Sequence, residues 1–212
     1  MLTLIIVAFS FLLLILLLKK YPFLSLFNLA RLKGKIGESF VAEILQEHLP
    51  KYKYMVIHNV TLPTDGGSTQ IDHIVLSQYG IFVVETKNMK GWIFGNEKQE
   101  FWTQKNFRKS NKFQNPLRQN YKHIKTLEKI LKTDGKIIFS VVVFVGDSIF
   151  KTPMPLNVVY GKEVVDYILS KQDKILTLEQ VYIIKNAIEN RMLERGSSTD
   201  MWHIKNVKKA KN

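Results

Sequence analysis

The chain has 212 residues, no cysteine and a net charge of +13 at pH 7. This length suits one domain of ordinary size with short additions. The absence of cysteine excludes disulfides, thiolate metal sites and cysteine nucleophiles. The excess of positive charge favours a polyanionic partner, either nucleic acid or an anionic membrane surface.

An apolar run covers residues 2–18, and only Thr3 and Ser10 interrupt it. A helix over residues 1–18 would span about 27 Å, close to the thickness of the hydrocarbon core of a bilayer. A cleaved signal peptide would need basic residues before the run and a small-residue cleavage site after it, and neither is present. We therefore expect residues 1–20 to form a transmembrane helix.

The orientation of this helix follows from the residues after it. Five basic residues come before the first acidic residue of the chain: Lys19, Lys20, Arg31, Lys33 and Lys35. By the positive-inside rule, the side that follows the helix faces the cytoplasm. We expect a single-pass protein of the cell membrane, with a juxtamembrane linker at residues 21–33 and a soluble domain in the cytoplasm.

The soluble part alternates between helical and strand patterns. The predicted elements in chain order are a helix at 34–49, strands at 54–60, 69–77, 81–87 and 101–102, a helix at 116–131, strands at 137–145 and 158–159, and helices at 163–170 and 178–194. Composition predicts a loop at 63–68, a tight turn at Tyr79-Gly80 and a turn at 88–95. This order predicts an α/β fold.

Three segments make up the predicted soluble part. Residues 34–150 are assigned to the main domain, and residues 151–195 to a C-terminal helical extension of the same domain. Residues 196–212 are polar and basic, and we expect them to form a flexible tail.

Two acids and a lysine lie at the ends of the apolar strands, where burying a charge is costly unless the charge is paired or serves a function. If Tyr79-Gly80 is a two-residue loop, Asp72 lies opposite Lys87, Glu85 is its diagonal neighbour, and all three side chains share one face. A three-residue loop would separate them unless a bulge corrected the register. The sequence leaves this choice open.

If these side chains converge, they predict a metal site. Asp72 and Glu85 would supply hard oxygen ligands for Mg²⁺ or Mn²⁺, and the backbone carbonyl of Thr86 would complete the ligand shell. A bound cation acidifies water and stabilises charge on a phosphate. Lys87 would orient the attacking water or stabilise the transition state. The alternative is an ordinary ion-pair cluster at solvated strand ends.

Helical residues add further candidates. Glu38 ends the apolar stripe of the first predicted helix, and Gly34 and Gly37 would let that helix approach the sheet closely. Gln119 and His123 lie one turn apart on the later helix, within reach of a phosphate or a bound water. Alternatively, Glu38 is a charge favoured by the helix dipole, and His123 is an ordinary histidine at the surface or the core edge.

Four motifs, in this order, resemble the nuclease-related domain (NERD) family. They are GKIGE at residues 34–38, QIDHIV at 70–75, VETKN at 84–88 and NPLRQNYKH at 115–123. The resemblance covers roughly residues 33–150. NERD domains are similar to the PD-(D/E)xK nucleases, so the resemblance implies a restriction-endonuclease-like core, a mixed central sheet flanked by helices.

The resemblance also implies a catalytic set. It consists of Glu38 as the helical acid, Asp72, Glu85 and Lys87 as the D…ExK signature, and Gln119 as the helix glutamine common in the superfamily. The proline that gives the superfamily its name is absent beside the aspartate, where Ile71 stands. The implied activity is metal-dependent hydrolysis of phosphodiesters.

Ten basic and two acidic residues lie between positions 105 and 136. Interleaved aromatics are Phe101, Trp102, Phe107, Phe113 and Tyr121. Basic side chains contact phosphates and aromatic rings stack on unpaired bases. The expected nucleic-acid contacts are Lys105, Arg108, Lys109, Lys112, Arg118, Lys122 and His123. The alternative is a solvated helix face over an aromatic core stripe.

The sequence as a whole predicts a membrane-anchored nuclease that depends on Mg²⁺ or Mn²⁺. Its expected partners are nucleic acid, with DNA preferred over RNA, and the bilayer through residues 2–18. Two alternatives remain open. One is a membrane-bound module that binds nucleic acid without cleaving it, and the other is a scaffold whose lysines meet anionic lipid.

Overall fold

The computed structural model describes residues 22–107 and 109–193, with side chains from Leu29 onward. The chain divides into two units, residues 1–36 and 37–212. Helix α2 (Pro22–His48) begins in the first unit and ends in the second. It starts well before the predicted residue 34. Residues 22–33 contain no glycine, and their one proline stands at the first helical position, where proline is tolerated.

No helix within the described residues is both long and apolar enough to cross a membrane. The predicted transmembrane helix at residues 1–20 and the predicted tail at 196–212 lie outside the described residues. All the strands of the described part belong to the second unit, which begins at Gly37.

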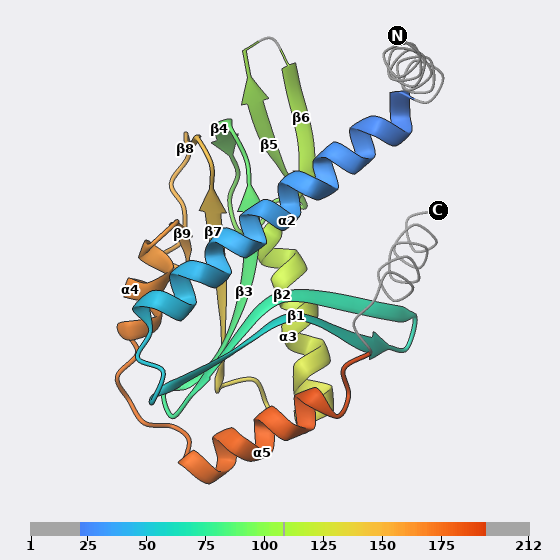
Figure 1. The fold of residues 1–212 in the computed structure, drawn as a ribbon. Coiled ribbons are helices and arrows are strands. Elements are labelled where there is room, and N and C mark those ends of the chain that lie inside the picture. The colour runs from blue at the N-terminus through green and yellow to red at the C-terminus, as the bar shows by residue number, and fades with distance from the viewer. Residues whose placement is uncertain (1–21, 108, 194–212) are drawn as a thin grey trace, which may run out of the picture. The chain divides into compact units, whose positions relative to one another are not determined.

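A five-stranded mixed sheet, here called the first sheet, has the order β1-β2-β3-β7-β9 (Figure 1). Its strands are β1 (Tyr54–Thr64), β2 (Gly67–Ser77), β3 (Gly80–Asn88), β7 (Ile138–Val145) and β9 (Val158–Tyr160). The first three form an antiparallel meander, and β7 runs parallel to β3 and β9. Helix α3 (Pro116–Leu131) lies between β3 and β7 in the chain, as the crossover of a parallel pair requires. The predicted mixed sheet with flanking helices is confirmed.

A second sheet of four strands has the order β6-β5-β4-β8. Its strands are β4 (Gly91–Phe94), β5 (Phe101–Asn106), β6 (Lys109–Gln114) and β8 (Ser148–Phe150). The turn predicted at 88–95 is wrong, because β4 lies within it. Strands β6 and β8 were not predicted. These strands are short, and β6 has no fully buried side chain, so the period-two apolar signal is weak.

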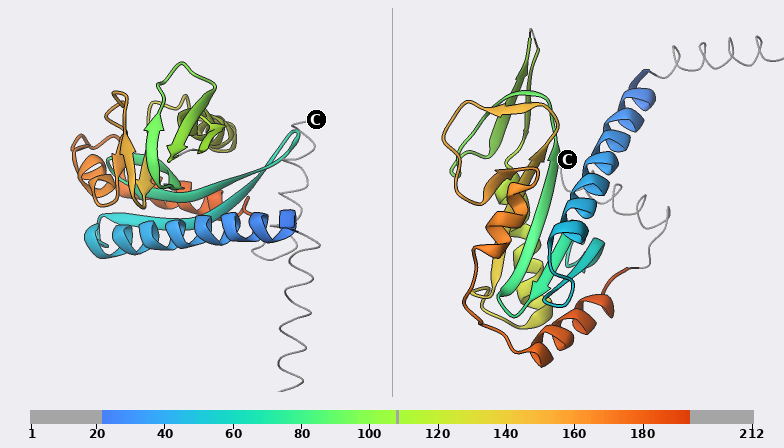
Figure 2. Two further views of the ribbon diagram at one scale, coloured as in Figure 1. Left: turned by 90° about the horizontal axis from the view of Figure 1, so that it is seen from above. Right: turned by 60° about the vertical axis from the view of Figure 1, so that its left-hand side comes forward.

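Helices cover both faces of the first sheet (Figure 2). The end of α2 and helix α4 (Glu163–Leu169) pack on one face, in a core that includes Leu45, Phe82 and Ile168. Helices α3 and α5 (Leu178–Glu189) pack on the other face, in a core that includes Leu127, Ile81 and Ile188. The second sheet buries Ile93 and Trp102 against Val142 and Phe144 of β7. Burial of these apolar side chains stabilises the layers.

The register of β2 and β3 places the candidate site. Ser77 pairs with Gly80, so the loop is Gln78-Tyr79 rather than the predicted Tyr79-Gly80. This shifts the pairing by two residues, and an even shift leaves the paired residues 73–77 of β2 on their expected faces. The predicted loop at 63–68 also shortens to Asp65-Gly66, because β1 and β2 both extend into it.

Candidate active site

Strand β2 separates from β3 where the acidic residues lie. The pairing of the two strands ends at His73 with Val84. On the other side of β2, Asn59 of β1 takes a positive φ of 52°, between the pairs His58–His73 and Val60–Ile71. Ile71 packs in the same core cluster as Ile74 and Leu76, which breaks the period-two alternation at Asp72-His73. The irregularity lies beside Asp72, whose carboxylate contacts β3.

The side chain of Asp72 accepts a hydrogen bond from the backbone of β3 where a backbone carbonyl of a neighbouring strand would otherwise do so. Its Oδ2 accepts a hydrogen bond of 2.7 Å from the backbone N–H of Thr86. Burial raises the pKa of Asp72 well above its usual value, and the negative charges of Glu85 and Glu38 raise it further. The Thr86 N–H and Lys87 act in the opposite direction but do not outweigh them. The site therefore concentrates negative charge that a bound cation would stabilise.

Glu85 and Lys87 are two residues apart on β3 and point to the same side. Lys87 Nζ donates to Glu85 Oε1 at 2.6 Å and to Gln119 Oε1 of α3 at 3.0 Å. Burial alone would raise the pKa of Glu85, but Lys87 and His123 outweigh it and hold that pKa below its usual value. Burial would likewise lower the pKa of Lys87, but the surrounding acids, Glu85 first, raise it instead. At neutral pH the pair is an ionised carboxylate and an ammonium.

His123 connects Glu85 to strand β2. It lies 4% exposed, with Nε2 at 3.3 Å from Glu85 Oε2 and Nδ1 at 2.7 Å from Thr69 Oγ1. An ionised Glu85 can only accept, so Nε2 of His123 donates to it, while Nδ1 lies within hydrogen-bond distance of the Thr69 hydroxyl. Both oxygens of Glu85 are thus held in place by neighbouring side chains.

Glu38 joins the site from the beginning of the second unit. Its charge raises the pKa values of Asp72 and Lys87. The preceding residue explains the approach, because a Cβ built on Gly37 would lie 2.7 Å from the Cβ of Asn88 at the end of β3. The predicted role of Gly37 in letting the helix approach the sheet is confirmed.

Two asparagines that the sequence did not single out as site residues fix helix α3. Asn115 caps it by accepting from the N–H of Leu117 at 2.9 Å. Asn120 is fully buried, and its Nδ2 donates to the carbonyls of Val83 at 2.8 Å and Val141 at 3.1 Å. These bonds attach the helix to β3 and β7, which positions Gln119 and His123 over the acids. Asn115 and Asn120 stand in the Asn-Pro…Gln-Asn…His motif, which is the signal that could have found them.

The donor set has the chemistry that Mg²⁺ and Mn²⁺ prefer, since Asp72, Glu85 and Glu38 offer carboxylate oxygens. Within the described residues, however, no group of three or more acidic or histidine side chains is arranged to hold a metal ion. Glu85 is 2% exposed and Lys87 is 19% exposed, so the site meets solvent on the lysine side. Because a carboxylate oxygen has two acceptor positions, Glu85 can bind a cation while keeping its present partners.

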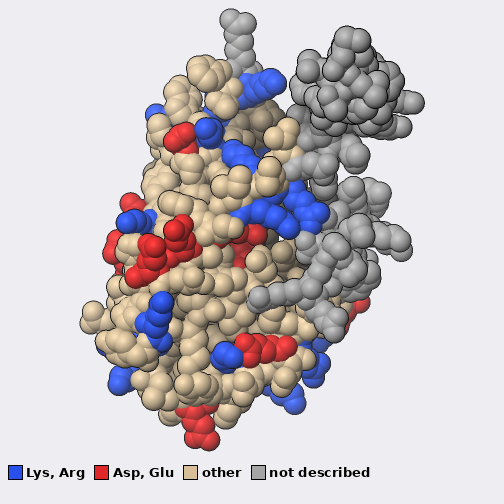
Figure 3. All heavy atoms as spheres, in the orientation of Figure 1, with Lys and Arg blue, Asp and Glu red and all other residues tan. Residues whose placement is uncertain are grey.

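Of the expected nucleic-acid contacts, those that the structure describes are exposed except for His123. Lys105, Lys109, Lys112, Arg118 and Lys122 are exposed, and Figure 3 shows basic side chains over the upper part of one face, where the β5–β6 hairpin lies. Arg108 lies outside the described residues. His123 is buried beside Glu85, and its contact with a phosphate or a bound water stays a prediction.

The aromatic residues interleaved with these lysines also divide. Trp102 is fully buried and Phe113 packs beside it in the core of the second sheet. Phe101, Phe107 and Tyr121 are exposed, with Phe107 at the end of the β5–β6 hairpin at 97% exposure. The core-stripe alternative therefore holds for Trp102 and Phe113 alone.

Comparison with known proteins gives two matches. A protein-family model described as the nuclease-related domain (NERD) matches residues 33–145. The chain is 55% identical over 101 residues to an uncharacterized protein of Bacillus anthracis, a match that covers 47% of each chain. The chain thus spans about half the length of the curated relative that it matches. The family match includes Glu38, Asp72, Glu85, Lys87 and Gln119.

Proposed function

Because the chain belongs to the nuclease-related domain family, we propose that it is a nuclease that hydrolyses phosphodiester bonds of nucleic acid with the help of a divalent metal ion. The observation that carries this proposal is the single contact network of Glu85, Lys87 and Gln119, with Asp72 beside it on β2. Two carboxylates beside a lysine on one face of a sheet match the arrangement of the PD-(D/E)xK nucleases, to which the sequence motifs are similar.

Each residue has a role in this proposal. Asp72, Glu85 and the backbone carbonyl of Thr86 would hold Mg²⁺ or Mn²⁺, whose oxygen preference they satisfy. Such a cation would supply an acidified water and positive charge opposite the phosphate. Lys87, protonated because the acids raise its pKa, holds the attacking water or the phosphate oxygens. Gln119 keeps the ammonium of Lys87 in position through their 3.0 Å hydrogen bond.

The supporting residues act on the acids. His123 fixes the carboxylate of Glu85 by a hydrogen bond, and Thr69 of β2 in turn holds the His123 ring. Glu38 adds a third negative charge, which strengthens attraction of a divalent cation. Several donors aimed at one group reduce its motion, and such preorganisation is what makes electrostatic catalysis effective.

The location and the substrate are further parts of the proposal. The apolar run at residues 2–18 and the basic residues after it support a single-pass anchor in the cell membrane, with the nuclease domain in the cytoplasm. The net charge of +13 supports a nucleic-acid substrate, and we propose DNA in preference to RNA.

Cleavage assays with the full-length protein in detergent test the proposal. Labelled DNA and RNA oligomers are incubated with Mg²⁺ or Mn²⁺, and with EDTA as the metal-free control. We expect Asp72→Ala and Lys87→Ala each to lower the cleavage rate by at least about a hundredfold, which is a typical loss for an electrostatic catalytic group. The matched controls are Asp65→Ala and Lys129→Ala, which break an exposed ion pair on the described surface. No cleavage of either polymer by the wild type would overturn the proposal.

A module that binds nucleic acid without cleaving it is the second candidate. It is favoured by the engagement of both Glu85 oxygens, one by Lys87 and the other by His123. Phosphate contacts dominate such binding. This candidate therefore predicts salt-sensitive binding that survives Asp72→Ala, with no turnover under any metal condition.

A further inference from the structure

One face of the second sheet carries exposed aromatic rings and lysines. Trp92 pairs with Lys105 on β5 and with Ile149 on β8, and Phe94 pairs with Thr103, which pairs with Lys112 on β6. Directly paired residues point to the same side of a sheet, as do residues two apart on one strand. The side chains on this face, here called the outer face, include Trp92, Phe94, Phe101, Lys105, Lys112 and Ile149. The opposite face carries Ile93 and Trp102 into the core.

The outer face is unusually apolar for a surface that meets water. Trp92 is 46% exposed, Phe101 49% and Ile149 52%. Lys151 Nζ lies 5.0 Å from the centroid of the Trp92 ring, which adds a third lysine to this face. Aromatic rings beside lysines, on a flat sheet, offer stacking surfaces and phosphate contacts at the same place.

A pocket of about 690 Å³ opens beside this face. Phe94, Phe101 and Lys112 line it from the sheet, and residues of the loop at 95–100 and of the segment at 152–153 line the rest. Its polar side chains include Asn96, Gln99 and Glu100, which provide both donors and acceptors. Aromatic walls with polar groups at the rim suit a nucleobase, which has a flat face and a hydrogen-bonding edge.

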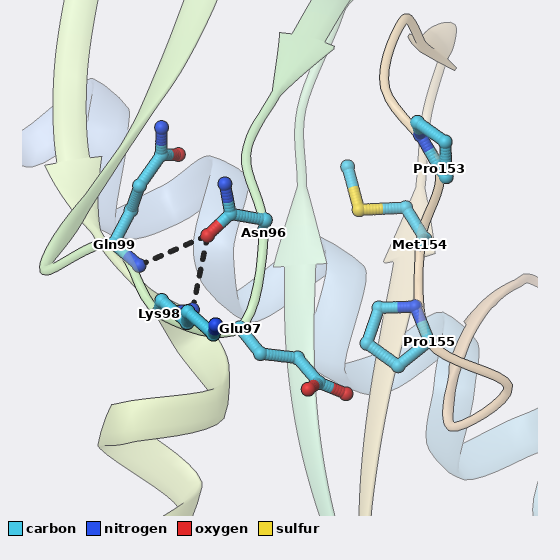
Figure 4. Close-up of a pocket in the computed structure, with 7 residues that line it drawn as sticks. All are labelled: Asn96, Glu97, Lys98, Gln99, Pro153, Met154 and Pro155. Carbon is cyan, nitrogen blue, oxygen red and sulfur yellow. Dashed lines mark hydrogen bonds between the residues drawn. The ribbon is translucent and has the colours of Figure 1, made fainter.

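A second hollow, of about 550 Å³, shares the same loop. Figure 4 shows Pro153, Met154 and Pro155 across from residues 96–99. Asn96 Oδ1 accepts from the backbone N–H groups of Lys98 at 3.0 Å and Gln99 at 3.1 Å, which fixes the conformation of the loop. The two hollows lie on a structured loop, so their shape is present before a ligand arrives.

The loop is also attached to the helix that serves the candidate active site. Asn115, the cap of α3, donates from Nδ2 to the carbonyls of Asn96 at 3.2 Å and Gln99 at 2.7 Å. One turn later, Gln119 accepts from Lys87. The loop is therefore attached to the same helix start that positions Gln119.

We propose that the outer face and its pocket bind unpaired bases of a nucleic acid, so that the substrate presented to the candidate active site is single-stranded. Trp92 and Phe101 stack on bases, and Lys105, Lys112 and Lys151 contact the phosphates between them. A duplex cannot use the stacking contacts, because its base faces are already stacked on one another. That the bound strand is a substrate rests on the proposed function, whereas the binding of bases does not depend on it.

Binding measurements test base recognition separately from cleavage. Fluorescence anisotropy with the full-length protein in EDTA, where a metal-dependent nuclease cannot cleave, compares three labelled probes of equal length. These are a thymidine oligomer, an abasic oligomer with the same phosphates, and a duplex. We expect the thymidine oligomer to bind about a hundredfold more tightly than the abasic one, because two stacked bases provide about tenfold each.

Matched variants locate the contacts. Trp92→Ala and Phe101→Ala should each weaken thymidine binding about tenfold and leave abasic binding unchanged, and Trp92→Phe should retain most of the affinity. The control is Tyr182→Ala, which removes a 54% exposed aromatic ring on α5. Lys105→Ala with Lys112→Ala should weaken both single-stranded probes and reduce the salt dependence of binding. Thermal melting of each variant verifies that it is folded.

The outcomes distinguish this inference from the proposed function. Equal binding of the thymidine and abasic oligomers, or wild-type affinity in both Trp92→Ala and Phe101→Ala, overturns the inference even if the protein cleaves DNA. Base-dependent binding that both variants lose supports it, even if no metal condition gives cleavage. Tighter binding of the duplex than of the thymidine oligomer also overturns it.

Discussion

The backbone N–H of Thr86 donates to the carboxylate of Asp72 at 2.7 Å. Strands β2 and β3 are therefore linked at this level by a side chain, just beyond the end of their backbone pairing at His73 and Val84. This hydrogen bond keeps Asp72 in a fixed position beside β3. The same residue thus closes the sheet and faces the candidate metal site.

The first prediction concerns the stability of this arrangement. Because burial and the neighbouring acids raise the pKa of Asp72, its ionised form destabilises the folded state at any pH above that raised pKa. Asp72→Asn keeps an oxygen for the Thr86 N–H and removes the charge. We expect it to raise the melting temperature in EDTA by about 2–4 °C, equivalent to about 1 kcal/mol for a chain of this size.

Differential scanning calorimetry checks this expectation, and metal addition provides its control. Mg²⁺ or Mn²⁺ should raise the melting temperature of the wild type, since a ligand of the folded state stabilises it, and should leave that of Asp72→Asn unchanged. A lower melting temperature for Asp72→Asn in EDTA would contradict the conclusion that the ionised carboxylate of Asp72 destabilises the folded state.

The second prediction concerns the hydroxyl that orients His123. Thr69→Val has nearly the same shape but removes the hydrogen bond of 2.7 Å to Nδ1. We expect single-turnover cleavage to slow by about tenfold, the effect of losing about 1.4 kcal/mol of positioning, within the usual range for a buried hydrogen bond. Thr69→Ser keeps the hydroxyl and should cleave at nearly the wild-type rate. Equal rates for the valine and serine variants would remove Thr69 from the network.

The third prediction tests the close approach of α2 to β3. In Gly37→Ala the new Cβ would lie 2.7 Å from Asn88 Cβ, which is not the flexible end of a side chain. We expect a loss of about 1–3 kcal/mol of unfolding free energy, typical of overpacking, and reduced cleavage because Glu38 moves with the helix. The control is Gly66→Ala, whose Cβ would have nothing within 4 Å. Urea denaturation measures both, and similar stabilities would contradict the contact.

The fourth prediction concerns the attachment of α3. Asn120 is stabilised through Nδ2, because its Oδ1 has no hydrogen-bond partner in the part of the chain that the structure describes. Asn120→Asp removes the donor and places a carboxylate against two carbonyls. We expect it to lower the unfolding free energy by about 3 kcal/mol or more, and by more than Asn120→Ala, since an uncompensated buried charge is costly. Urea denaturation compares the two, and an aspartate variant as stable as the alanine variant would contradict this account.

The elements that were easiest to predict have strong local signals. The long apolar run of β7 and the Asn115-Pro116 start of α3 were found nearly to the residue. The second sheet was largely missed. Its strands β4, β6 and β8 are stabilised by pairing with a neighbouring strand and by packing against β7. Propensity over four or six residues is too weak to show this, and tertiary contacts decide.

The sequence by itself determined the residue types of the candidate site, since Asp72, Glu85, Lys87 and Gln119 follow from motif and alternation. The tertiary structure decided how they meet. It moved the β2–β3 loop by one residue and the strand pairing by two, and it brought Asp72 to the Thr86 N–H. It also brought Thr69 to His123 and His123 to Glu85, from three different elements. The physical reason is that alternation is a local property of the backbone, whereas register, strand separation and side-chain networks depend on contacts between residues far apart in the chain.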